Sequence, residues 1–178
     1  MRNLDKFTSL IKHNGIAHKH NFSTTFTMPK CLESKYSIND IESICTLVTT
    51  SPLKGTTIMS MQKRTGTPIA FELPYEKASS TFDISFLLIN DYKTFNFFSD
   101  WMGYIYNSST GTWGIKENYQ SEIEVINEDK SGNPKFKMIH YECWPKELSS
   151  VELDTNDSST PIILTVTFVC TYSKRKPI

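Results

Sequence analysis

Hydrophobic and polar residues alternate through much of the second half of the chain, and this spacing of two is typical of half-buried strands. Residues 119–126 and 135–143 both alternate, and Ser131-Gly132-Asn133-Pro134 separates them. Because these four residue types favour a turn, the two runs predict a β-hairpin. A Trp144-Pro145 pair then precedes a predicted short strand at residues 151–153.

The chain closes with a long predicted strand, residues 161–172. One face of this closing strand is apolar and comprises Ile162, Leu164, Val166, Phe168, Cys170 and Tyr172. The other face carries Thr165, Thr167 and Thr171. We therefore expect one side of the strand to be buried and the other to be polar.

The first half of the chain predicts strands at residues 21–28, 44–50 and 81–89, with an irregular segment at 30–43 that includes a helical turn near Asp40. Alternate residues of the first strand (Phe22, Thr24, Phe26, Met28) and of the third (Phe82, Ile84, Phe86, Leu88) form the faces that we expect to be buried.

Residues 54–80 are the least regular long section of the chain and form an insert between the second and third of these strands. We interpret them as two extended arms, Thr56–Gln62 and Ile69–Leu73, around a loop at residues 63–68. Such arms expose backbone groups that can pair with another chain.

One main helix is predicted in mid-chain, from about residue 91 to residue 106, with Asn90 or Asp91 as its N-cap. Its apolar stripe at helical spacing consists of Phe95, Phe98, Met102 and Ile105, flanked by Trp101. Residues 107–118 are rich in Ser, Thr and Gly and predict a surface loop.

These elements predict a single, mainly β domain (α+β) that spans residues 1–178. Six or seven strands with one packed helix favour a closed or nearly closed antiparallel β-barrel or sandwich. A short amphipathic helix predicted at residues 3–14 makes residues 1–20 an N-terminal helical arm.

The composition adds an uneven distribution of charge. The chain holds 19 basic and 19 acidic residues, so no net charge attracts it to nucleic acid. Residues 1–35 hold six basic against two acidic residues, whereas residues 117–157 hold ten acidic against four basic. Separate basic and acidic regions favour self-association.

The cysteines and the hydropathy of the chain indicate the compartment in which it folds and whether it is anchored in a membrane. Its four cysteines are widely spaced, which is consistent with folding in a reduced intracellular compartment. No apolar run approaches the length of a membrane span, so we expect no membrane anchoring.

The sequence offers no positive case for catalysis or for a cofactor. His13, His18 and His20, with Cys31 beyond them, fit no standard zinc spacing. His140 falls in a predicted strand without a nucleophile signature, which favours a structural role. We therefore predict no catalytic, cofactor-binding or metal-binding residue.

A specific order of elements carries a family resemblance. A strand, a helix with Phe95-x-x-Phe98-Ser-Asp-Trp101, a hairpin, Trp144-Pro145, a short strand and a long terminal strand follow one another. This order resembles the tail-tube proteins of contractile-tailed bacteriophages. The similarity covers residues 20–173, whereas residues 107–118 and 54–80 depart from the family's pattern.

The resemblance implies a structural subunit of a phage tail tube. In such a tube six copies form a ring, and stacked rings make a hollow conduit for DNA inside a contractile sheath. The implied partners are further copies of the chain, the sheath protein, the baseplate and tail-terminator proteins, and the tape-measure protein and genomic DNA in the lumen. The implied location is the virion, after assembly in the host cytoplasm.

The resemblance also indicates which residues join the rings. Residues 55–74 match the long loop that reaches the neighbouring ring, and residues 1–20 are a second candidate. The candidates in the loop are Thr56, Met59, Met61, Lys63 and Arg64. Lys63-Arg64 either meets an acidic patch on the next ring or forms a solvated loop tip.

Glu122 and Glu124 are candidates for the lumen wall, because an acidic wall would repel DNA. Alternation on a strand does not distinguish the inner from the outer surface of a tube, so an exposed outer face is an equal alternative.

Other functions fit parts of the pattern. Within the family, the chain could form a baseplate tube-initiator or tail-terminator ring, or be a secretion-system tube protein of the same fold. A carbohydrate-binding β-sandwich would use Trp113, Tyr104 and Tyr106 as an exposed platform. A hydrolase would be built on His140 and the acidic hairpin.

Overall fold

A computed structural model describes residues 20–53, 55, 58–64, 66, 70–77, 80–151 and 160–177. Its elements are β1 (Phe22–Phe26), a 3-10 turn (Lys30–Leu32), α2 (Ile38–Thr46), β2 (Val48–Thr50), β3 (Ile58–Lys63), β4 (Phe71–Lys77), β5 (Ser80–Leu87), α3 (Lys93–Ile105), β6 (Tyr106–Asn107), β7 (Thr112–Trp113), α4 (Lys116–Tyr119), β8 (Ser121–Glu128), β9 (Pro134–Leu148), β10 (Ile163–Cys170) and β11 (Tyr172–Lys176). The helix predicted at residues 3–14 and most of the strand predicted at 151–153 lie outside the described residues.

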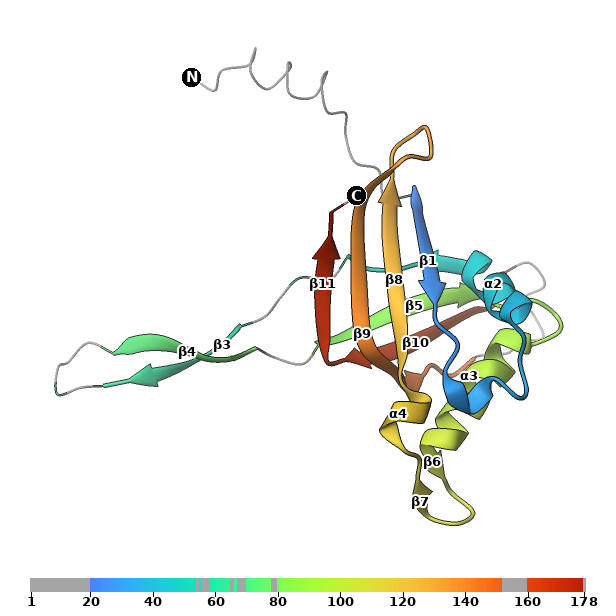
Figure 1. Ribbon diagram of the computed structural model, residues 1–178, viewed down its shortest axis with the longest axis horizontal. Helices are drawn as coiled ribbons and strands as arrows, with labels where there is room; N and C mark the ends of the chain where they lie inside the picture. The colour runs from blue at the N-terminus through green and yellow to red at the C-terminus, as the bar shows by residue number, and fades with distance from the viewer. Residues whose placement is uncertain are drawn as a thin grey trace.

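Seven antiparallel strands form one bent sheet in the order β1-β8-β9-β10-β5-β2, and β11 also pairs with β9. The long strand β9 belongs to both halves. Its first part pairs with β8 and β11, and its last part pairs with β10. Figure 1 shows the front sheet (β1, β8, β9, β11) crossing the back sheet (β10, β5, β2). The predicted mainly β, nearly closed antiparallel architecture is confirmed.

The bend of β9 lies at Glu142, which has a positive φ of 53°. The register with β8 shifts here, between Ser121 and Ile123, so this is a β-bulge. The Glu142 carboxylate accepts hydrogen bonds from Lys116 Nζ at 2.5 Å and from Thr171 Oγ1 at 2.9 Å. These two donors, Lys116 first, hold the pKa of Glu142 below its ordinary value. The contacts fix the corner at which the front sheet turns into the back sheet.

Two predictions near this corner were wrong in detail. Strand β9 does not stop before Trp144-Pro145 but continues to Leu148. Pro145 faces Phe168 beside a register shift, and such irregular positions tolerate a residue without an N–H. The single closing strand predicted over residues 161–172 is two strands, β10 and β11, which separate at Thr171.

The core lies between the two sheets and is closed by α3. Phe86, Phe98, Trp101 and Phe168 are completely buried and their rings contact one another. As predicted, alternate residues of β5 (Phe82, Ile84, Phe86) and β10 (Leu164, Val166, Phe168, Cys170) face this core.

The main helix is confirmed, but its buried face is shifted from the predicted stripe. The structure buries Thr94, Phe97, Phe98, Trp101 and Ile105, whereas Phe95 and Met102 are only partly covered. The N-cap is Tyr92, in a left-handed conformation, and Asp91 Oδ1 accepts a hydrogen bond from the Lys93 backbone N–H at 3.0 Å.

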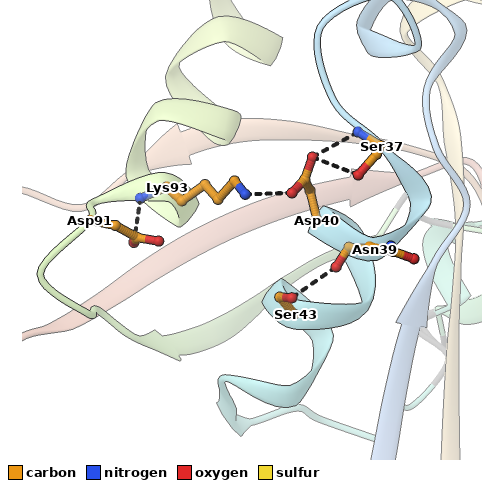
Figure 2. Close-up of polar contacts among 6 residues, drawn as sticks. All are labelled: Ser37, Asn39, Asp40, Ser43, Asp91 and Lys93. Carbon is orange, nitrogen blue, oxygen red and sulfur yellow. Dashed lines mark hydrogen bonds and ion pairs between the residues drawn. The ribbon is translucent and has the colours of Figure 1, made fainter.

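A further helix, α2, occupies a segment for which we predicted irregular chain with a helical turn near Asp40, followed by a strand at residues 44–50. The predicted turn falls within α2, but the predicted strand was wrong, since only β2 is extended there. Figure 2 shows the polar contacts that begin α2: the Asp40 carboxylate accepts hydrogen bonds from the backbone N–H and the hydroxyl of Ser37, both at 2.8 Å. Asp40 also pairs with Lys93 at the start of α3. Lys93 and Ser37 hold the pKa of Asp40 at about 2.

The surface loop predicted at residues 107–118 is exposed but is not irregular throughout. Strands β6 and β7 pair to form a small hairpin, and α4 follows them.

Candidate assembly surfaces

Strands β3 and β4 form an antiparallel hairpin, here called the arm, that projects away from the sheets. Figure 1 shows the arm at one end of the long axis of the molecule, with α2 and α3 at the other end. Every described arm residue from 58 to 64 and from 71 to 77 is exposed. The two strands of the arm, Ile58–Lys63 and Phe71–Lys77, pair with each other, whereas the sequence predicted two extended segments at Thr56–Gln62 and Ile69–Leu73.

The arm has one apolar face. Met61 lies opposite Leu73 and Lys63 lies opposite Phe71, and residues opposite each other point to the same side of a hairpin. By alternation this face carries Met59, Met61, Phe71, Leu73 and Tyr75 together with Lys63, and Glu76 lies opposite Met59 at the bulge. The Tyr75 hydroxyl contacts Met59 Sδ at 3.8 Å. The opposite face is more polar and carries Ser60, Gln62 and Glu72, together with Pro74 and Ile58, which is 64% exposed. The apolar side chains of the first face are each between 42% and 54% exposed, so a monomer leaves that face in water.

The structure places most of the predicted ring-joining residues on the arm. Met59, Met61 and Lys63 belong to its apolar face, and Arg64 follows at the exposed tip. Thr56 lies outside the described residues. The sequence did not reveal which face of the arm is apolar, because a bulge between Met59 and Ser60 changes the register of the hairpin.

A groove of about 630 Å³ lies between β1 and α2. Its apolar lining includes Phe22, Phe26, Met28, Ile38, Ile41 and Val48. Among the described residues that line the groove, Glu42 alone carries a charge. The groove was not predictable from the sequence pattern, because one of its walls is α2, of which only a helical turn near Asp40 was predicted.

Glu122 and Glu124 lie on β8, on the side of the front sheet that faces away from the core. Glu122 is exposed, and the half-buried Glu124 forms an ion pair with Lys137 at 2.5 Å. Alternation puts Lys137 and Lys174 on the same side of the sheet, so the acidic character does not extend beyond β8.

The outward side of the back sheet carries hydroxyl groups that bond to one another. Ser85 Oγ lies 3.1 Å from Thr165 Oγ1, and Thr167 Oγ1 donates to Asp83 Oδ1 at 2.7 Å. The threonines of the predicted closing strand indicated this polar surface.

The aromatic residues of the alternative carbohydrate-binding interpretation lie near the β6–β7 hairpin. Trp113 is exposed and its ring is 4.8 Å from that of Tyr106, and Tyr104 is also exposed. His140, by contrast, is completely buried between the sheets. Its Nδ1 lies 2.7 Å from Ser173 Oγ and its ring packs on Phe82, so no substrate can reach it.

Of the three histidines that fit no standard zinc spacing, His13 and His18 lie outside the described residues. In the part of the chain that the structure describes, no helix is both long enough and apolar enough to cross a membrane.

Comparisons with known proteins identify the family of this fold. Residues 17–175 match the family model described as phage tail tube protein. A comparison with curated proteins finds no match.

Several solved structures share the fold at low sequence identity. One is the sheath–tube complex of PVC, an extracellular contractile injection system, in its extended state: 16% identity, TM-score 0.64, covering 96% of this chain and 98% of that chain. Another is the tube-terminating cap of the anti-feeding prophage: 14% identity, TM-score 0.64, covering 92% of each chain. The sheath/tube terminator of PVC has 13% identity and a TM-score of 0.64, and covers 90% of this chain and 96% of that chain.

The family model spans most of the chain, and the solved structures have the same fold over nearly their whole length. The chain therefore belongs to the phage tail tube protein family.

Proposed function

We propose that this chain is a structural subunit of a tail tube, in which hexameric rings stack into a hollow conduit for DNA inside a contractile sheath. The observation that carries this proposal is the arm. An isolated two-stranded hairpin is only marginally stable, and an exposed apolar face marks a site of association. In a tube protein, the natural partner of such a face is another copy of the chain.

The sheet edges support the formation of rings. Strands β1, β2 and β11 each pair with one neighbouring strand in the described part of the chain. A free edge can add a strand from another subunit, and this addition extends a sheet across an interface. In this arrangement the edges of β2 and β11 join copies within a ring. The candidates for joining one ring to the next are Met59, Met61, Lys63 and Arg64 of the arm, together with Thr56.

The partners and location follow from the proposed tube. The similar structures are described as a sheath–tube complex, a terminator and a baseplate, which supports sheath, terminator and baseplate proteins as partners. The tape-measure protein and genomic DNA would occupy the lumen, with Glu122 and Glu124 as candidate wall residues. The chain would reside in the virion after assembly in the host cytoplasm, with a structural rather than an enzymatic role.

A specialised ring at one end of the tube is the second candidate. The fold similarity to a terminator, a TM-score of 0.64, equals the similarity to the sheath–tube complex. An end ring would form hexamers that do not stack on one another, whereas a tube subunit would form long polymers.

Negative-stain electron microscopy of the purified chain, with light scattering over a concentration series, tests the proposal. We expect hollow rings or stacked tubes whose mass grows with concentration. Single rings that never stack would favour the end-ring role. A protein that stays monomeric at every concentration would contradict assembly and would justify a glycan-binding screen of Trp113, Tyr104 and Tyr106.

A further inference from the structure

The groove between β1 and α2 has the chemistry of a receptor for the arm. Ile38, at its rim, is 72% exposed, and the partly covered Phe22, Phe26 and Val48 continue the apolar lining. The arm offers the matching surface, an apolar face whose side chains are each between 42% and 54% exposed. Burying both surfaces against each other removes apolar area from water on both sides.

One side-chain hydroxyl of β1 also indicates a bound partner. Thr24 is 3% exposed and lines the groove, yet its Oγ1 has no hydrogen-bond partner among the described residues. A buried hydroxyl without a partner is costly, so a donor or acceptor is expected to come from outside the monomer.

The backbone of β1 is available as well. Thr27 N–H donates to Glu122 O and Glu128 N–H donates to Asn21 O, so the odd-numbered residues of β1 pair with β8. In an antiparallel ladder the even-numbered residues, including Phe22 and Thr24, then direct their backbone groups to the free edge. A second hairpin lying in the groove would meet these groups.

The charges and positions of the two surfaces are complementary. Glu42 is the charge in the groove lining, and the arm carries Lys63 on its apolar face and Arg64 at its tip. Figure 1 shows the arm at one end of the molecule, and β1 and α2, whose residues line the groove, lie towards the other end. A contact between two unlike surfaces is heterologous. Each copy can therefore bind one copy through its arm and another copy through its groove.

The wall formed by α2 is held in place by its contacts. Asp40 binds Ser37 at the start of α2 and Lys93 at the start of α3, and Ser43 Oγ donates to the Asn39 carbonyl oxygen at 2.8 Å within the helix (Figure 2). The groove is therefore preformed, and a partner need not order it.

We infer that the groove between β1 and α2 receives the apolar face of the arm from another copy of the chain. This inference rests on the proposed function, since it names the surface through which one ring holds the next. It assigns Ile38, Ile41 and Thr24 to the receiving side of the contact.

Cysteine cross-linking tests the pairing directly. In a full-length chain with Cys31→Ser and Cys45→Ala, Ile38→Cys is combined with Met61→Cys on the apolar face of the arm. The matched control combines Ile38→Cys with Ser60→Cys, the adjacent residue on the opposite face. Because a disulfide needs closely spaced Cα atoms, we expect Met61→Cys to yield dimers and higher oligomers at least about tenfold faster than Ser60→Cys.

A second variant tests the groove without cysteines. Ile38 is the first residue of α2, where an acidic side chain suits the helix, so Ile38→Asp should fold normally. It places a carboxylate in the apolar groove and should raise the concentration needed for assembly at least about tenfold. The control is Ile115→Asp, an exposed isoleucine at the N-cap of α4 and outside the groove, which should assemble as wild type.

The outcomes separate this inference from the proposed function. Wild-type tubes together with equal cross-linking of the two cysteine pairs, or normal assembly of Ile38→Asp, would overturn the groove as receptor and leave the tube function intact. A wild-type chain that forms no polymers, together with cysteine variants that form no cross-linked dimers, would overturn both.

Discussion

Trp101 illustrates how single residues hold this fold together. Its side chain is completely buried in the aromatic cluster of the core. Its indole N–H donates to the Tyr119 carbonyl oxygen at 2.7 Å, so the one polar group of the side chain is satisfied. The residue therefore ties α3 to the segment that begins β8.

Replacing Trp101 with alanine should lower the free energy of unfolding by about 3–5 kcal/mol, because it leaves a large cavity and an unpaired carbonyl group. Chemical denaturation measures this change. Trp113→Ala serves as the control, since Trp113 is 76% exposed and its loss should change stability by less than about 0.5 kcal/mol. Similar stabilities for the two variants would contradict the assignment of Trp101 to the core.

Asp40 should make the stability of the fold depend on pH in the acid range. Its pKa falls from the ordinary 3.8 to about 2 in the folded chain, chiefly through Lys93. A depressed pKa stabilises the fold at pH values above the unfolded value, and this stabilisation is lost as the pH falls from about 4 towards 2. Asp40→Asn should therefore be less stable than wild type at pH 7, and the difference should vanish near pH 2 in denaturation curves. A difference that persists unchanged at pH 2 would contradict this role.

At the scale of elements, the sequence predicted the strands of the core well, since β5 and β10 alternate without interruption. Only a helical turn near Asp40 was predicted where α2 lies, because the isoleucines and threonine of this helix are typical of strands. The signal that favoured a helix was Ser37 with Asp40 three residues later, a helix-start pattern. The division between β10 and β11 leaves no mark in the pattern, because alternation continues through Thr171. The bend of β9 depends on contacts between distant residues, which periodicity cannot reveal.

The bend of β9 predicts a difference in stability between two variants of Glu142. Glu142 has a positive φ, which costs non-glycine residues about 1 kcal/mol or more, and its carboxylate contacts Lys116 and Thr171. Glu142→Ala and Glu142→Gly both remove these contacts, but only glycine relieves the backbone. Glu142→Gly should therefore be more stable than Glu142→Ala, by about 1 kcal/mol in denaturant titrations. Equal or reversed stabilities would show that the bend does not constrain this residue.

At the scale of the whole molecule, the order of elements was enough to place the chain in its family. The arm was also located from its irregular, exposed sequence. The surface that would receive the arm was not predictable, because the groove combines β1 with a helix close to it only in space. Which polar sheet face lines a lumen also depends on neighbouring copies, and a single chain does not encode that choice in its alternation.

Deleting residues 60–70 should leave a soluble, folded monomer, because the arm contributes nothing to the core. The variant should form no stacked rings, since it loses Met61 from the apolar face together with Lys63 and Arg64. Circular dichroism and electron microscopy would measure folding and stacking side by side. Gln62→Ala, on the polar face of the arm, is the matched control and should stack normally. Long tubes from the deletion variant would contradict the role of the arm.

The placement of the arm at one end of the molecule and of the groove towards the other end gives any stack of these subunits a direction. One terminus of the stack would display free arms, and the other would display empty grooves. The two termini would therefore be chemically unlike, and a protein that caps one of them could not cap the other by the same contact. A protein that binds the first ring of a stack would therefore need a different surface from a protein that stops growth at the opposite terminus.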